Sequence, residues 1–196
     1  MGGYGLQILG LLGLAVLGLV AGGPAGQGED SKPHVTTTTT THINYKTAKP
    51  FAAVTADLEK QLGKFDPSIY APAPGVKFDP KEIVAKSRAS EGSSGLMIFA
   101  RYDHGALLAL VGRKAEGRQY VIGNPLVALQ MTQVNLVAGE CAPVRLFVYA
   151  GDDGMTYVDY DLPSSVFGRF DSPEIAKVAK GLDEKVERLV RNAIAP

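Results

Sequence analysis

Apolar and polar residues alternate in several short runs of the chain, and in other runs apolar residues recur every three or four positions. Residues 42–47 and 144–160 carry the two-residue alternation typical of strands with one buried face. The Asp-Gly pair at 153–154 is a hairpin signal, so an antiparallel pair of strands is expected around it. The pattern predicts two further strands, at residues 96–102 and 118–122.

Helical spacing is strongest at the C-terminus. Ser172 is a favourable N-cap, Pro173 suits the first turn, and an apolar stripe runs from there to Ala193. Residues 51–62 place apolar side chains at spacings of 3, 4 and 4, which predicts an amphipathic helix ending at Gly63. Shorter helices are expected at residues 80–87, 106–111 and 126–134.

The order of these elements predicts an α+β fold with a single mixed, largely antiparallel sheet and helices packed on one side. Residues 64–80 contain four prolines, which cannot sit inside regular structure. We therefore expect this stretch to be a long surface excursion.

The N-terminus differs from the rest of the chain, because no charged residue precedes Glu29. Residues 6–20 form an apolar run whose length is typical of a signal peptide rather than of a membrane span. We expect residues 1–22 to be a signal peptide or membrane anchor, 23–41 a flexible Thr-rich linker and 42–196 one domain.

No Lys or Arg precedes the apolar run, which leaves three interpretations open: a cleaved export signal, an uncleaved anchor, or a leader of no consequence. Export to a periplasmic or extracellular location is favoured. Membrane contact is then expected only through the N-terminal segment, if it stays uncleaved.

Composition excludes several classes of protein. Lys plus Arg and Asp plus Glu both total 20, so the basic excess of a nucleic-acid-binding protein is missing. Cys141 is the single cysteine, which excludes an intramolecular disulfide and a zinc-thiolate cluster, and it is expected to be a buried thiol. His34, His42 and His104 lack ligand spacing, so no metal and no cofactor are predicted.

Four short motifs occur in the chain: DHG at 103–105, YVIGNP at 120–125, PVR at 143–145 and YDLPSS at 160–165. In order and separation they are similar to motifs of the uncharacterised DUF302 family, which the chain resembles over residues 42–193. The resemblance implies a compact α+β domain that forms a homodimer. It implies no activity.

Asp103 and His104 form the most catalytic-looking pair, because an imidazole beside a carboxylate can act as a general base. Neighbours on a strand point to opposite faces, however, so they are poorly placed for an Asp-His relay. The favoured interpretation makes Asp103 a turn or cap acceptor and His104 a partly buried, hydrogen-bonded side chain. A ligand-facing role stays open.

Three more residues complete the candidate binding set. Asn124 is expected in a turn, and Tyr160 lies on the alternating second strand of the hairpin. Arg145 shares a strand face with Phe147 and Tyr149, so its charge must reach solvent, a carboxylate or a bound anion. We expect His104, Asn124, Arg145 and Tyr160 to converge on one surface.

The sequence therefore predicts an exported, noncatalytic module that binds a small anionic or amphipathic ligand or a protein. One alternative is a small hydrolase or isomerase with His104 as its general base. Another is an envelope structural protein.

Overall fold

The computed structural model describes the following parts of the chain: residues 33–71, 74–75, 77 and 79–196. The expected leader, residues 1–22, and the first part of the expected linker, residues 23–32, lie outside the described residues. The fold reported below is that of Thr37–Pro196, one of the two units into which the chain divides.

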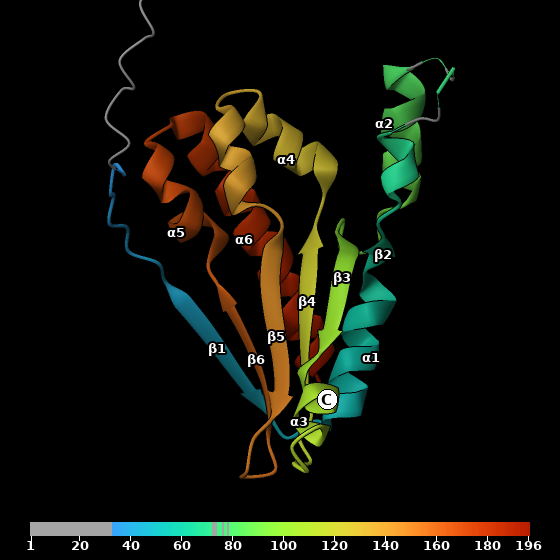
Figure 1. The fold of residues 1–196 in the computed structure, drawn as a ribbon, viewed down its shortest axis with the longest axis vertical. Coiled ribbons are helices and arrows are strands. Elements are labelled where there is room, and N and C mark those ends of the chain that lie inside the picture. Colours follow the sequence, from blue (N-terminus) through green and yellow to red (C-terminus); the bar gives the residue numbers. More distant parts are fainter. Residues whose placement is uncertain (1–32, 72–73, 76, 78) are drawn as a thin grey trace, which may run out of the picture. The chain divides into compact units, whose positions relative to one another are not determined.

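Six strands in this unit form one mixed sheet in the order β1-β6-β5-β4-β3-β2 (Figure 1). Every neighbouring pair is antiparallel except β2 and β3, which run parallel. The strands are β1 His42–Thr47, β2 Gly63–Lys64, β3 Met97–Asp103, β4 Gly117–Gly123, β5 Val144–Ala150 and β6 Thr156–Asp161. The predicted α+β class with a largely antiparallel sheet is confirmed.

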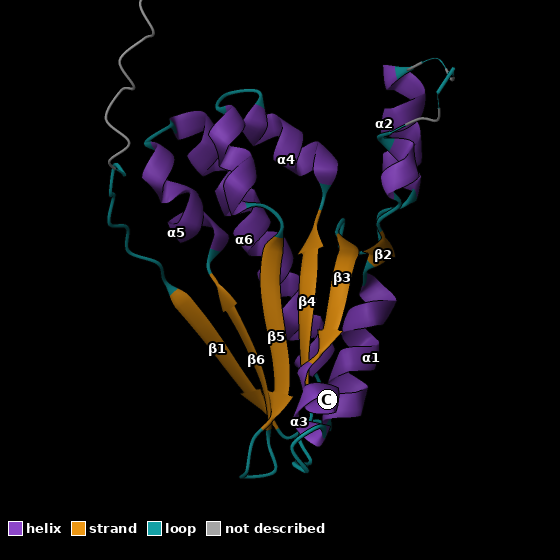
Figure 2. Cartoon of the chain, in the orientation of Figure 1, coloured by secondary structure: helices purple, strands orange, loops and turns teal. Residues whose placement is uncertain are grey.

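Helices lie in the connections between the strands, except between β5 and β6, and α5 and α6 follow the last strand (Figure 2, purple). The α-helices are α1 Phe51–Gln61, α2 Pro80–Ala89, α3 His104–Ala109, α4 Pro125–Thr132, α5 Pro163–Phe167 and α6 Pro173–Ile194. Short 3-10 helices occur at Pro67–Ile69, Leu136–Cys141 and Gly168–Phe170. No helix among the described residues combines the length and apolar character needed to cross a membrane.

The core lies between the sheet and two helices, α1 and α6, which cover the same face of it (Figure 1). Ser172 caps α6 by accepting a hydrogen bond from the amide of Ile175, as the sequence predicts. Full burial of a Val or Leu side chain contributes about 1.5–3 kcal/mol. Such fully buried side chains come from both layers: Val54, Leu58, Leu146, Val148, Val158, Val186 and Val190.

The segment after α1 is more ordered than the prolines suggest. Gly63 pairs with Met97 of β3, and α1 ends at Gln61 rather than at the glycine. A Cβ on Gly63 would lie 1.8 Å from the carbonyl oxygen of Ser90, so only glycine fits there. This close approach starts β2, an edge strand that the sequence analysis did not predict.

The α4 region departs from the expected pattern. The roughly helical spacing of Leu126, Leu129, Met131 and Val134 predicts a helix over residues 126–134, and α4 spans Pro125–Thr132. Met131 is buried, but Leu129 and Val134 are 54% and 45% exposed. Since α4 is short and its apolar residues are not confined to one face, only part of its apolar surface can face the core.

The edge strand β1 is linked to β6 by a histidine. The Nδ1 atom of His42 lies 3.0 Å from Oδ1 of Asp161, and its Nε2 atom lies 3.7 Å from Oδ2 of Asp159. The hydrogen bond to Asp161, aided by the charge of Asp159, raises the pKa of His42 above its ordinary value.

This raised pKa predicts a pH-dependent contribution to stability that His42→Gln removes. Because the folded state favours the protonated ring, the contribution is complete below the ordinary pKa of about 6.5 and disappears as pH rises through the folded pKa. We expect wild type to exceed His42→Gln in unfolding free energy by at most about 1 kcal/mol near pH 5.5, since the pair is exposed. Urea unfolding near pH 5.5 and 8.5 measures this, and an equal difference at both would contradict it.

Candidate functional site

Two of the candidate site residues, His104 and Asn124, lie at opposite ends of the strands of the sheet. Asp103 ends β3 and His104 begins α3, whereas Asn124 follows the end of β4. Because β3 and β4 are antiparallel, the two strands end at opposite edges. His104 and Asn124 therefore do not share a surface.

Alternation along β5 separates the other two candidates. Leu146 pairs directly with Tyr160, so both point to the helix-covered face, and both are buried. Arg145, the neighbour of Leu146, points to the opposite face and is exposed. The structure therefore does not produce the expected convergence of the candidate residues.

Asp103 performs the capping role that the sequence favours. Its Oδ1 atom accepts a hydrogen bond of 2.8 Å from the amide of Ala106 and so begins α3. His104 is half-buried, with its ring edge against Phe147 at a centroid distance of 5.5 Å.

The expectation that His104 is hydrogen-bonded is wrong at Nε2, which is buried and has no partner among the described residues. Its ring meets the Phe147 ring edge-on, and this contact supplies no hydrogen-bond partner for the nitrogen. No described carboxylate hydrogen-bonds to the ring, so an Asp-His relay is not formed. The geometry gives the hydrolase or isomerase alternative no support.

Arg145 and Tyr160 have contrasting environments. Arg145 shares the exposed face with Phe147 and Tyr149, as predicted, and forms no ion pair with any described residue. Tyr160 stacks on Tyr45 at 6.4 Å, and burial raises the pKa of its hydroxyl. Tyr160 is therefore a core residue rather than a ligand contact.

A polar cluster that the sequence analysis missed joins α1 to the sheet. Oε1 of Glu59 accepts hydrogen bonds from the Tyr120 hydroxyl at 2.8 Å and from Arg118 at 3.3 Å. Arg101 donates to both carboxylate oxygens, at 3.0 and 3.1 Å. Burial opposes ionisation of Glu59, yet these hydrogen bonds and the two arginine charges lower its pKa.

The same cluster keeps Tyr120 protonated, since burial and the neighbouring Glu59 raise its pKa to about 12 despite Arg118. With Glu59 held as a carboxylate by three donors, the cluster is a satisfied ion-pair network that fixes α1 on the sheet. Glu59 lies 42 to 61 residues before its three donors, so no local sequence pattern could have joined it to them.

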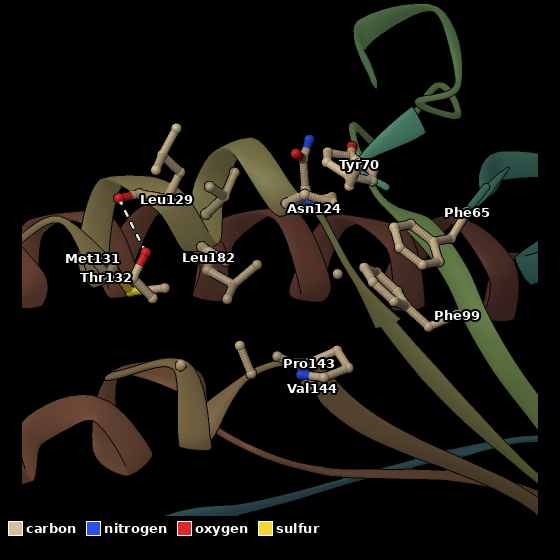
Figure 3. Close-up of a pocket in the computed structure, with 16 residues that line it drawn as sticks. Phe65, Tyr70, Phe99, Asn124, Leu129, Met131, Thr132, Pro143, Val144 and Leu182 are labelled. Carbon is tan, nitrogen blue, oxygen red and sulfur yellow. Dashed lines mark hydrogen bonds between the residues drawn. The ribbon is translucent and has the colours of Figure 1, made fainter. Parts of the chain in front are cut away.

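An apolar pocket lies under α4, where β4 ends and β5 begins (Figure 3). We call it the α4 pocket. Its volume of about 370 Å³ falls within the range of small-ligand sites. The pocket is lined by Phe65, Tyr70, Phe99, Gly123, Asn124, Pro125, Val127, Ala128, Leu129, Met131, Thr132, Gly139, Ala142, Pro143, Val144 and Leu182.

One wall of the α4 pocket is aromatic and comes partly from the Pro-rich excursion. Phe65 stacks on Phe99 with ring centroids 4.1 Å apart and on Tyr70 at 5.5 Å (Figure 3). Phe99 reaches this wall because β3 carries an irregularity in its pairing between Ile98 and Ala100. The excursion is therefore part of the site as well as a surface loop.

The side-chain polar groups around the α4 pocket are already paired within the protein. Asn124 accepts from the amide of Leu126 at 2.8 Å and donates to Glu91 and to the carbonyl oxygen of Gly95. The Tyr70 hydroxyl bonds to Ser87 at 2.5 Å.

The remaining hydroxyl of the lining, that of Thr132, donates to the carbonyl oxygen of Leu129 at 3.4 Å. The pocket thus presents an apolar surface with little free hydrogen-bonding capacity, which suits an apolar guest. Asn124, a predicted site residue, borders the pocket but acts as the N-cap of α4.

Metal-binding chemistry is not assembled in the described residues, where no group of three or more His, Cys, Asp or Glu is placed to hold an ion. Cys141 is half-buried, and burial raises the pKa of its thiol. A raised pKa disfavours the nucleophilic thiolate.

Comparison with known proteins identifies a family and a fold. A family model described as "Domain of unknown function DUF302" matches residues 75–193. The crystal structure of an uncharacterized conserved DUF302 protein from Bacillus stearothermophilus is similar, with a TM-score of 0.55 and 15% identity over 78% of this chain and 97% of its own. A search of curated proteins gives no match.

The internal bonding of Asn124 predicts that Asn124→Ala costs stability. The change removes a helix cap and leaves the partly buried Gly95 carbonyl without this donor, so we expect a loss of about 2 kcal/mol in unfolding free energy. Asn135 offers a control, because it caps the next turn through the amide of Val137 but is exposed. Urea unfolding should show a smaller loss for Asn135→Ala, and equal losses would contradict this role of Asn124.

Proposed function

The chain belongs to the DUF302 family, and we propose that its domain is a noncatalytic module that binds a small apolar or amphipathic molecule in the α4 pocket. The observation that supports this proposal most strongly is that the pocket is apolar and that the polar side chains around it hydrogen-bond to other groups of the protein. When an apolar molecule binds to such a surface, both apolar surfaces leave contact with water, which is favourable in free energy.

The lining also favours a guest with an apolar body over a small charged metabolite. The side-chain amide nitrogen of Asn124 already donates to Glu91 and to the carbonyl oxygen of Gly95, so its two donor hydrogens are not free for an anionic ligand. Among the residues that the structure describes, no Lys or Arg side chain lines the pocket. The anionic ligand weighed from the sequence would rest on Arg145, which does not line the pocket, so a charged headgroup would have to remain in solvent.

Export and self-association belong to the same proposal. The uncharged apolar run at residues 6–20 supports a cleaved signal or an anchor, and the family resemblance supports a homodimer. An exported carrier would shield its apolar ligand from water in the periplasm or outside the cell, where such a molecule is poorly soluble.

Filling the cavity tests the proposal. Ala128 lines the pocket from α4, so Ala128→Phe should place a ring in the space that the guest would occupy. We expect lauric acid and naphthalene to raise the melting temperature of wild type, and Ala128→Phe to weaken the binding at least about tenfold, or about 1.4 kcal/mol.

Ala52→Phe is the matched control. Ala52 is exposed on α1, so this substitution adds the same ring outside the pocket. It should bind both probes as wild type does. Failure of both probes to stabilise wild type, or equal weakening by the two variants, would remove the α4 pocket as a binding site.

A further inference from the structure

The aromatic wall of the α4 pocket is separate from the buried core. Phe65, Tyr70 and Phe99 are each half-buried, and none of them belongs to the core of the described chain. They pack on one another instead, with Phe65 stacked on Phe99 at 4.1 Å and on Tyr70 at 5.5 Å. Aromatic side chains normally contribute to a fold by burying large areas in its core. Core packing therefore does not account for three rings at this position.

Phe99 reaches the pocket at a cost in strand pairing. The pairing of β3 with β4 shifts between Ile98 and Ala100, so Phe99 has no partner residue on β4. Irregularities of this kind redirect a side chain and are common beside functional sites. Figure 3 shows the Phe99 ring pointing into the pocket, and Phe65 covers one face of that ring. The rest of the ring is therefore available to a bound molecule.

Gly123 allows the Phe99 ring to lie close to the backbone of β4. A Cβ on Gly123 would lie 3.4 Å from Cε2 of Phe99 and 3.2 Å from Cβ of Pro143, so a larger residue would push these side chains away. Phe65 supports the same ring from one face. A ring that is held in place before binding loses little conformational entropy when a ligand packs on it.

From these observations we propose that the ligand of the α4 pocket carries an aromatic ring that packs on Phe99, which makes Phe99 a specificity-determining residue. The inference rests on the proposed function. An acyl chain would gain the same burial from an aliphatic wall, whereas an aromatic ring gains an additional attraction from offset or edge-to-face contact with another ring. The aromatic wall, the shifted strand pairing and the supported ring therefore favour an aromatic ligand over a saturated one.

Two carboxylates of equal carbon number, phenylbutyrate and cyclohexylbutyrate, test this proposal because they differ in the aromaticity of the ring. Phe99→Leu keeps the wall apolar and removes its aromatic ring. We expect the dissociation constant of phenylbutyrate to rise about fivefold in Phe99→Leu, and that of cyclohexylbutyrate to change by less than about twofold. Isothermal titration calorimetry measures both constants. Comparing the two changes cancels the different water solubility of the probes.

Phe147→Leu is the matched control, because Phe147 is half-buried on the sheet face opposite α1 and α6 and does not line the pocket. This variant should bind both probes as wild type does. Nuclear Overhauser effects between the ring protons of bound phenylbutyrate and those of Phe99 are expected in wild type. They give a second measurement that does not depend on the stability of a variant.

The outcomes separate this proposal from the proposed function. If lauric acid, naphthalene and both butyrates all fail to bind wild type, the α4 pocket is not a binding site and both proposals are wrong. If Phe99→Leu weakens the two butyrates equally, or bound phenylbutyrate shows no Overhauser effect to Phe99, the aromatic preference is wrong and the pocket stands. The same conclusion follows if lauric acid binds and phenylbutyrate does not.

Discussion

The packing of α6 against the buried face of β5 and β6 is the contact on which the rest of the structure depends. Leu146, Val148 and Val158 are fully buried, and they alternate with less buried residues along the two strands. A shift of one residue in either strand would turn these side chains out and turn charged or polar ones in. The register of the hairpin, the position of α6 and the ends of the neighbouring strands are therefore fixed together.

The ends of these strands determine which candidate site residues can lie close together. Antiparallel neighbours end at opposite edges, so motifs that follow β3 and β4 are separated by the length of the sheet, although few residues lie between them in the sequence. The DHG motif caps α3 at one edge, and the Asn124 motif caps α4 at the other. The two motifs lie close together in the sequence because each begins a helix, and not because they form one site.

Much of the fold could be predicted from local pattern, because alternation, helical spacing and capping residues act over a few positions. The hairpin around 153–154 and the Ser172 cap of α6 are examples. The α4 pocket could not be predicted, since its aromatic wall joins Phe65, in a Pro-rich stretch, to Phe99, which reaches it through an irregularity in β3. Neither feature has a periodic signature.

The inward bonding of polar groups around the α4 pocket also limits how selective it can be. A site with free donors rejects ligands that leave them unpaired, whereas an apolar site distinguishes guests mainly by volume, at about 1–3 kcal/mol per methylene. The side-chain amide of Asn124 caps α4 and hydrogen-bonds to Glu91 and Gly95. Asn124 therefore stabilises the pocket and does not select the ligand. A pocket built in this way favours a class of apolar molecules of similar volume over a single metabolite.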